Sequence, residues 1–414
     1  MRIVYLNACG KLGGAETSLR ELLASVRAAA PDSELCLVLG EDGPLADAVR
    51  EWGVETVIAP FPSALARLGD SRKSKLSLAG SLLKATAATF TYKRKLAKIL
   101  KQKNPDIIHT NGFKMHLLGA WTRSGTPLVW HIHDYVSTRP LMSRALGAYQ
   151  KNCTAAIVNS KSVGRDLGTL LPRLRIVPIY NAVDLRRFSP VGPGFDLDQA
   201  AGLAPAEQGT VLVGLVATFA RWKGHKTFLN ALSRLPREVP VRGYIIGAPI
   251  YQTDGSQWSI EELKQEAERL GLKDRIGFTG FVEHTPGVMR SLDIVVHAST
   301  EPEPFGMVII EAMACGTPII VSAAGGASEL FEEGENAVSH QPGDAAALAR
   351  QIERLARDPE LRQRLAVAGR ARAERFFPGS RMAEEVLALY RDIHGESAGV
   401  KSGSVVRTVP VASE

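Results

Sequence analysis

The chain has 414 residues, of which 45% are hydrophobic and 22% charged, and its formal net charge is +7. This length exceeds one ordinary core, so two domains are expected, and the composition excludes a disordered or fibrous protein. No apolar run reaches the roughly 18 residues of a membrane-spanning helix. The four cysteines lack metal-ligand spacing and the chain starts with a strand rather than a signal peptide, so we expect a reduced, cytoplasmic protein.

The first half of the chain alternates short apolar strands with helical segments. A Gly-rich loop follows the first strand, and a helix is expected from about Ala15, with apolar residues at helical spacing up to Val26. The alternation predicts a largely parallel sheet with helices on both faces. The strands are expected at residues 3–6, 35–39, 54–59, 106–109, 127–131, 155–158 and 175–179.

A strongly basic segment interrupts this series between residues 67 and 103. Leucine, isoleucine and phenylalanine are interleaved with the charges, as in a basic amphipathic helix pair that binds an anionic membrane or an anionic acceptor. The alternative is a solvated helix face. Nucleic acid is not expected, because no recognised binding motif accompanies the charge. Opposed only by Asp70, the basic residues are Arg67, Arg72, Lys73, Lys75, Lys84, Lys93, Arg94, Lys95, Lys98, Lys101 and Lys103.

The regular alternation breaks near residues 181–190, where proline and glycine follow, and we place the domain boundary there. The predicted organisation is a first domain at 1–185, a linker at 186–209 and a second domain at 210–376. A helix at 377–394 is expected to pack back on the first domain, and 395–414 to form a flexible tail. Strands of the second domain are expected at 210–218, 242–246, 275–278, 293–297 and 318–321.

Residues 303–318 are the most informative stretch of the chain. Glu303 precedes a Pro-Phe-Gly turn that opens a helix, and Gly316 and Pro318 close it. Glu311 lies about five residues inside, roughly 7–8 Å along the helix axis. Free N–H groups at a helix start bind anions. The element therefore presents two carboxylates and a row of N–H donors over the length of a sugar–diphosphate–ribose, although a buried helix with two incidental acids is the alternative.

From about residue 211 to 376 the chain resembles the donor-binding half of family 4 glycosyltransferases, and the first half resembles the family more loosely. The resemblance implies an α/β, GT-B fold, in which two Rossmann-like, doubly wound domains face each other across a cleft. It also implies a retaining reaction with a nucleotide-sugar donor. The motifs that carry it are Gly13-Gly14-Ala15-Glu16, His131-Ile132-His133-Asp134, Asn181-Ala182-Val183-Asp184, Trp222-Lys223-Gly224, Phe278-Thr279-Gly280-Phe281-Val282, residues 303–318, and Ala324-Gly325-Gly326 before Glu329.

Two basic residues are candidates for stabilising the leaving diphosphate. Negative charge grows on its oxygens as the glycosidic bond breaks, and preorganised cations lower that barrier. Lys223 follows the first strand of the second half and is the natural cation. The family carries an arginine five residues earlier, where this chain has Thr218, so Arg221 is the candidate for the second charge. The alternative for both is an ordinary surface side chain.

The resemblance assigns the rest of the donor to the helix start and to neighbouring loops. It implies that Glu303 binds hydroxyls of the donor sugar and Glu311 those of the ribose, which suits ionised carboxylates because they only accept hydrogen bonds. Glu301 competes with Glu303, but the spacing to Glu311 favours Glu303. Backbone or apolar donor contacts are implied for Phe305, Gly306, Met307 and Val308 and, near the nucleotide, for Gly247, Phe281 and Val282, with core packing as the alternative for Phe281.

On the first domain, Gly13 and Gly14 lie in the first strand-to-helix turn, where the backbone can approach a phosphate closely. A tight turn is the alternative. His133 resembles the family histidine that touches the donor sugar. We expect His131 and His133 to face opposite sides of their strand, with His131 packed inside. No third ligand accompanies this pair, so neither a metal nor a cofactor beyond the donor substrate is expected.

Together these features predict a retaining, hexosyltransferase-type glycosyltransferase. It would move a sugar from a nucleotide-diphosphate donor to a hydroxyl of a glycan, a lipid-linked or a small-molecule acceptor, in the cytoplasm or on the inner membrane face. Two alternatives share the scaffold: a non-catalytic sugar-nucleotide or glycan-binding subunit, and a sugar-nucleotide epimerase. A dehydrogenase is disfavoured, because G-x-G-x-x-G is absent from the first turn.

Overall fold

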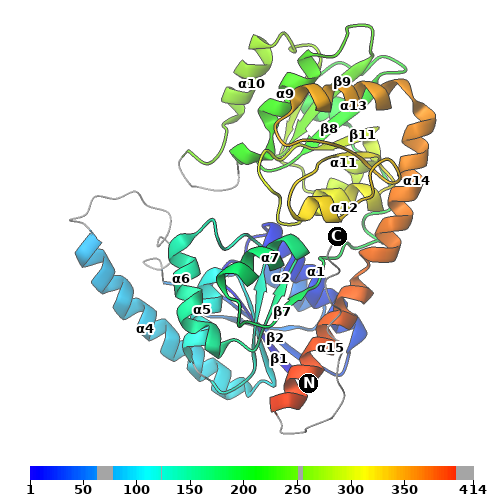
Figure 1. Ribbon diagram of the computed structural model, residues 1–414. Helices are drawn as coiled ribbons and strands as arrows, with labels where there is room; N and C mark the ends of the chain where they lie inside the picture. Colours follow the sequence, from blue (N-terminus) through cyan, green and yellow to red (C-terminus); the bar gives the residue numbers. More distant parts are fainter. Residues whose placement is uncertain (63–77, 123, 250–254, 398–414) are drawn as a thin grey trace.

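The computed structural model describes residues 1–62, 78–122, 124–249 and 255–397 of the chain. Two α/β domains lie one above the other and are joined by a long helical segment at one side (Figure 1). The predicted fold class is confirmed, since each domain is a parallel sheet with helices on both faces.

The N-terminal domain is built on a seven-stranded parallel sheet of order β3-β2-β1-β4-β5-β6-β7. Its strands form where apolar, β-branched residues follow one another, as expected for a sheet buried on both faces. The order reverses at β1, so the first loops on either side of that strand diverge and leave a crevice at the carboxyl ends. The strands are β1 (Arg2–Asn7), β2 (Glu34–Leu39), β3 (Glu55–Ile58), β4 (Ile107–Asn111), β5 (Leu128–Ile132), β6 (Ala155–Val158) and β7 (Ile176–Pro178).

Alternate residues of these strands enter two separate cores. Ile3 and Tyr5 of β1 pack on one face of the sheet, whereas Val4 and Leu6 pack on the other. Helices cover both faces, and in chain order they are α1 (Gly14–Ala29), α2 (Pro44–Glu51), α4 (Leu78–Lys103), α5 (Phe113–Thr122), α6 (Pro140–Tyr149), the 3₁₀ turn η1 (Gln150–Asn152) and α7 (Lys161–Leu170).

The C-terminal domain repeats this plan with a six-stranded parallel sheet of order β10-β9-β8-β11-β12-β13. Its strands are β8 (Val211–Val216), β9 (Val241–Ile246), β10 (Ile276–Gly280), β11 (Ile294–His297), β12 (Ile319–Ser322) and β13 (Val338–His340). The covering helices and 3₁₀ turns are α8 (Leu197–Ala201), η2 (Arg221–Lys223), α9 (His225–Ser233), α10 (Ile260–Arg269), α11 (Thr285–Ser291), α12 (Met307–Ala314), η3 (Gly326–Glu329), α13 (Ala345–Arg357) and α14 (Pro359–Phe376).

The chain crosses between the domains twice, and the two crossings pair with each other. Val183 N–H donates to the Phe377 carbonyl at 2.9 Å, and Val183 and Pro378 form a parallel bridge. After the second crossing, α15 (Gly379–Ser397) packs along α1, and Figure 1 shows it below α14 against the N-terminal domain. Met382, Val386 and Tyr390 of α15 thereby complete one core of that domain.

Several predicted boundaries differ in detail from the structure. Residues 186–209 contain the short helix α8 rather than only a linker, and α15 continues through Ser397, past the predicted start of the tail. The remaining tail, 398–414, lies outside the described residues. So do Arg67, Arg72, Lys73 and Lys75 of the basic segment, and the side chain of Lys84 is likewise not described.

Candidate active site

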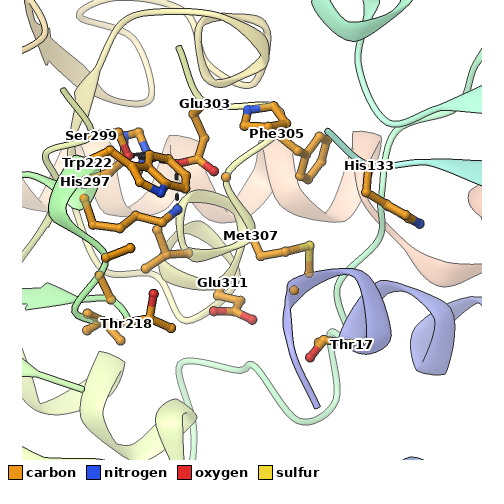
Figure 2. A pocket seen from close by; sticks show the side chains of 18 of the residues that line it. Thr17, His133, Thr218, Trp222, His297, Ser299, Glu303, Phe305, Met307 and Glu311 are labelled. Carbon is orange, nitrogen blue, oxygen red and sulfur yellow. Dashed lines mark hydrogen bonds and ion pairs between the residues drawn. The ribbon is translucent and has the colours of Figure 1, made fainter. Parts of the chain in front are cut away.

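A cavity of about 470 Å³ lies between the two domains at the carboxyl ends of both sheets. Residues after β8 and β11, the loop at 303–306 and the first turns of α12 line its C-terminal side. The start of α1 and the residues that follow β5 line its N-terminal side. Figure 2 shows Glu303, Met307 and Glu311 on the first side, with Thr17 and His133 on the second.

Glu303 is the centre of the polar network on the C-terminal side. Three donors reach its Oε2 atom: Lys223 Nζ at 2.8 Å, Ser299 Oγ at 2.7 Å and His297 Nε2 at 3.1 Å. Within the described chain no protein donor is recorded on Oε1. Since Glu303 lines the cavity, this second oxygen is available to accept hydrogen bonds from a ligand.

The network keeps the Glu303 carboxylate ionised although the residue is only 6% exposed. Burial alone would raise its pKa, but the charge of Lys223 and the hydrogen bond from His297 outweigh it and hold the pKa well below the usual range. Glu303 is therefore a fixed acceptor at neutral pH. It is unsuited to act as a general acid there, because it carries no proton to give.

Lys223 ends the short turn η2 and enters the cavity between a carboxylate and an aromatic ring. Its ammonium lies 3.9 Å from the centroid of the Trp222 ring and forms the ion pair with Glu303. Figure 2 shows the Trp222 ring beside Glu303 and His297. An aromatic face and a buried carboxylate both attract the ammonium group and hold it beside the cavity.

The start of α12 supplies backbone donors to the same cavity. Gly306 caps the helix with φ of +101°, and no described side chain caps it. This φ favours glycine, and a Cβ atom at the position would also lie 2.7 Å from Ile309 Cδ1, so that side chain would have to move. The first N–H groups of α12 are thus free to bind an anion.

Glu311 lies one turn further along α12 and also lines the cavity. It is half-buried, and burial raises the pKa of its carboxyl to about 7, although the nearby charge of Arg187 lowers it. Near neutral pH the group is consequently divided between its protonated and ionised forms. A ligand whose hydroxyls donate to the carboxylate would shift this balance toward the ionised form.

On the N-terminal side a chain of amides orients His133. Asn111 Nδ2 donates to Asn7 Oδ1 at 2.9 Å, so Asn111 Oδ1 is left as the acceptor for His133 Nε2 at 2.6 Å. This arrangement assigns the proton to Nε2 and leaves Nδ1 as an acceptor. Burial lowers the pKa of His133 to about 4, so the ring is neutral at pH 7.

The expectation that His131 and His133 face opposite sides is wrong. Their ring centroids are 4.0 Å apart, because residues two apart in a strand share one face. His131 is packed inside as expected, 2% exposed, and its Nδ1 lies 3.2 Å from His109 Nε2.

The structure brings most of the predicted donor residues to this cavity. Its lining includes Gly14, His133, Lys223, Glu303, Phe305, Gly306, Met307, Val308 and Glu311. Gly13 is adjacent as the N-cap of α1. Phe305 packs its ring against Tyr180 and Phe377, so its backbone rather than its ring is the part suited to ligand binding.

Other predicted residues lie outside the lining. Arg221 turns away: its guanidinium stacks 3.7 Å from the Trp258 ring centroid and pairs with Glu262 at 3.1 Å. Phe281 is 69% exposed, and Val282 packs on the C-terminal core. Gly247 touches the rim, since a Cβ atom there would lie 1.9 Å from the carbonyl of the lining residue Ala217.

Two family models match the chain, one on each domain. The model described as glycosyl transferases group 1 matches residues 204–372, and the model described as glycosyltransferase family 4 matches residues 12–187. The chain belongs to the family 4, group 1 glycosyltransferases. The resemblance drawn from the motifs is thereby confirmed for both halves, including the more loosely matching first half.

Similar sequences include bacterial glycosyltransferases. The lipopolysaccharide core biosynthesis glycosyltransferase LpsE of Rhizobium meliloti (strain 1021) is 29% identical over 222 residues, which cover 54% of this chain and 59% of LpsE. The N-acetyl-alpha-D-glucosaminyl L-malate synthase of Bacillus anthracis is 23% identical over 310 residues, which cover 72% of this chain and 78% of that protein.

Solved structures of glycosyltransferases superpose over almost the whole chain. HepE of Anabaena, crystallised with UDP, is 25% identical, with a TM-score of 0.75 over 95% of this chain and 100% of its own. A sucrose-phosphate synthase from Thermosynechococcus elongatus shares the fold with a TM-score of 0.75 at 22% identity, over 95% of this chain and 99% of its own. The predicted GT-B architecture is therefore confirmed.

The described residues form neither a metal-binding cluster nor a membrane-spanning helix. No group of three or more His, Cys, Asp and Glu side chains in this part of the chain is arranged to hold a metal ion. Among the described helices, none combines the length and the apolar character needed to span a bilayer.

The sequence motifs did not identify the residues that hold Glu303 and His133 in place. His297 and Ser299 hold Glu303, and Asn111 holds His133, yet none belongs to a motif quoted above. One sequence signal was present: His297 ends the strand before Glu303, and carboxyl ends of parallel strands converge on such sites.

Proposed function

We propose that this glycosyltransferase is a retaining enzyme that transfers a hexose from a uridine diphosphate sugar to an acceptor hydroxyl. The observation that carries the proposal is the Lys223–Glu303 pair, 2.8 Å apart beside the uncapped start of α12. This arrangement offers a cation and N–H groups for a diphosphate, and Glu303 Oε1 for sugar hydroxyls. The choice of uridine rests on HepE, whose structures contain UDP and UDP-glucose.

The proposed reaction proceeds on one face of the sugar. The diphosphate departs toward Lys223 and the α12 amides, and the acceptor hydroxyl attacks from the same side while a leaving phosphate oxygen takes its proton. Glu303 and neutral His133 hold the sugar, and Glu311 accepts hydrogen bonds from the ribose. The pair of carboxylates is not read as a glycosidase pair, since Glu303 is held ionised in an ion pair rather than poised to deliver a proton.

The proposed acceptor is a growing polysaccharide or a lipid-linked core saccharide. LpsE is named for lipopolysaccharide core biosynthesis, and the basic helix α4 suits an anionic acceptor or membrane. On its described part, Tyr92, Leu96 and Ile99 pack into the domain. The exposed residues of α4 include Phe90, Arg94, Lys95, Lys98 and Lys101.

Ligand binding and transfer test the donor assignment in one series. Thermal unfolding is followed with UDP, GDP and ADP, and then with the matching sugar conjugates, because a ligand that binds only the folded state raises the apparent stability. We expect UDP and one UDP-hexose to shift the midpoint. Release of UDP from that conjugate with an acceptor, and the anomeric configuration of the product by NMR, test transfer and retention. An inverted product, or a shift with GDP or ADP alone, would reject the corresponding part of the proposal.

The same series decides between the enzyme and a second candidate, a donor-binding subunit without transferase activity. Thr218 lines the cavity where family members carry an arginine, and Arg221 faces Glu262 instead. A protein that binds UDP-hexose but releases no UDP with any tested polysaccharide or lipid-linked acceptor would favour the binding subunit.

Vesicle co-sedimentation tests the proposed role of α4. Binding to anionic vesicles at low salt is expected to weaken at high salt and to fall several-fold in a Lys95→Glu, Lys98→Glu double variant. The matched control is Lys264→Glu, Lys273→Glu, which makes the same charge change at exposed positions of the C-terminal domain. Equal loss in both variants, or binding that ignores salt, would reject a docking role for α4.

A further inference from the structure

A carboxylate of the C-terminal domain reaches across the cleft and caps a helix of the other domain. Glu329 Oε1 accepts from Ser162 N–H at 2.7 Å, and Oε2 accepts from Lys161 N–H at 2.8 Å. These amides begin α7 of the N-terminal domain. The Tyr180 hydroxyl donates to the same Oε2 at 3.0 Å. A negative charge at a helix start is stabilised by the unpaired N–H groups and the helix dipole.

The turn before Glu329 brings the domains too close for any side chain. A Cβ atom on Gly325, whose φ is +68°, would lie 2.3 Å from the Tyr135 hydroxyl of the N-terminal domain. One on Gly326 would lie 2.8 Å from Ser160 Cβ, also in the N-terminal domain. Both glycines are therefore needed for this approach, independently of the Glu329 contacts.

The same turn is bonded to the backbone of Glu303. Gly326 N–H donates to the Glu303 carbonyl at 2.7 Å, and Glu303 N–H donates to the Ala324 carbonyl at 3.3 Å. Tyr135 contacts both the Glu303 loop and α7, because its hydroxyl lies 3.3 Å from the Glu303 carbonyl and 3.0 Å from Ser162 Oγ. The loop that holds Glu303 is thus connected to the N-terminal domain directly through Tyr135 and indirectly through the turn that ends at Glu329.

We propose that Glu329 is a positioning residue: with Tyr135 it clasps the domains closed and fixes the Glu303 loop for donor binding. The clasp consists of Tyr135, Ser162, Gly325 and Glu329. The effect of the clasp on donor binding rests on the proposed function, whereas its effect on domain closure does not. The nearby Arg165 adds little, since its guanidinium is 4.0 Å from Glu329 and its side chain is 74% exposed.

Hydrogen exchange and solution scattering test closure without any ligand. In Glu329→Ala the amides of Lys161 and Ser162 lose their acceptor and should exchange at least about tenfold faster, because a charge-assisted bond is lost. The radius of gyration should increase. Tyr135→Phe, which removes one hydroxyl, should show a smaller change in the same direction. Unchanged exchange at both amides together with an unchanged radius of gyration would overturn the clasp.

The matched control for closure is Glu332→Ala. Glu332 is an exposed acid three residues further on and pairs with Arg372 of its own domain at 2.6 Å. It should leave the exchange of both amides and the radius of gyration as in the unmodified protein. Faster exchange in this variant as well would show a general effect of removing charge and would also overturn the proposal.

Donor titration tests positioning. Glu329→Gln keeps one acceptor oxygen but loses the charge, and the KM for UDP-hexose should rise about tenfold while kcat at saturation changes less. The reason is that bound donor restores the closed state at the expense of its own affinity. A KM equal to that of the unmodified protein would overturn this part. If the unmodified protein neither binds UDP nor transfers, the proposed function fails, and the exchange experiment still decides the clasp.

Discussion

The two sides of the cavity differ in how they carry charge. On the C-terminal side Lys223 and Glu303 form an ion pair, and Glu311 lines the same cavity. On the N-terminal side His133 is neutral, since burial lowers its pKa to about 4, and Asp134 is paired with Arg139 at 2.9 Å. The contrast indicates that the C-terminal side responds to a charged ligand. The N-terminal side keeps its charge unchanged while it orients the ligand.

The largest effect is expected on the charged side, from Lys223→Ala. Without this cation the developing charge of the diphosphate loses a preorganised partner, and kcat for transfer should fall about 100- to 1,000-fold. Steady-state kinetics with UDP-hexose measure it. Lys226→Ala is the control, because Lys226 stacks on Trp258, 4.3 Å from the ring centroid and outside the lining. Equal loss in both variants would contradict the contrast.

The N-terminal domain is expected to lose stability at acidic pH. Burial lowers the pKa of His109 to about 3, so the unfolded state, with a pKa near 6.5, binds more protons between these values. Stability is fully present above about pH 6.5 and decreases as the pH falls toward 3, by about 2 kcal/mol at pH 5 for this residue. Urea unfolding at pH 7 and pH 5 measures the change.

Hydrogen exchange at pH 5 shows which domain loses stability first. Histidines with a lowered pKa are more numerous in the N-terminal domain (His109, His116, His131 and His133) than in the C-terminal domain (His225 and His340) among the described residues. Protection should therefore decrease in β4 and β5 before it decreases in β8 and β11. The reverse order would remove the distinction between the two sides.

A smaller effect should appear in the pH dependence of nucleotide binding. Burial raises the pKa of Glu311 to about 7, so most of this carboxyl is protonated at pH 6 in the free protein. If the ribose binds the ionised form, the affinity for UDP should increase about tenfold from pH 6 to pH 8. Isothermal titration calorimetry measures this. Glu311→Gln should bind more weakly and without that dependence, and a dependence that survives the substitution would exclude Glu311 as its source.

The smallest effect is expected from Asn111→Ala, which removes the hydrogen bond that orients the His133 ring and changes no charge. Losing one neutral hydrogen bond should lower kcat/KM about five- to tenfold. Asn152→Ala is the control, since Asn152 bonds the Ala120 carbonyl at 2.8 Å in the same domain, away from the lining. A loss as large as that of Lys223→Ala would show that the neutral side also carries charge-dependent steps.

The strands were largely predictable because their signal is local. Apolar runs such as Leu35–Leu39 and Ala155–Val158 match β2 and β6 within one residue, and helix start and stop signals placed α12. The exception is β13, only three residues long at Val338–His340, which is too short to show a pattern.

The supporting contacts of the site were not predictable in this way. His133 and Asn111 are 22 residues apart, and Ser162 and Glu329 are 167 apart. Such pairs form only when the sheet order and the domain closure are known. The side chain of Arg221 points away from the cavity for a local reason. Because η2 is a 3₁₀ turn with three residues per turn, Arg221 and Lys223, which are two residues apart, point to different sides.

The paired crossings between the domains have a consequence for synthesis of the protein. Residues 184–376 stand as an insertion between β7 and the helix α15 that completes the core of the first-made domain. The ribosome must therefore synthesise the whole C-terminal domain and then Met382, Val386 and Tyr390 before the N-terminal domain can complete this core. The core of the C-terminal domain is complete once Phe377 has been made, so the domain synthesised second can finish folding before the one synthesised first, against the usual order.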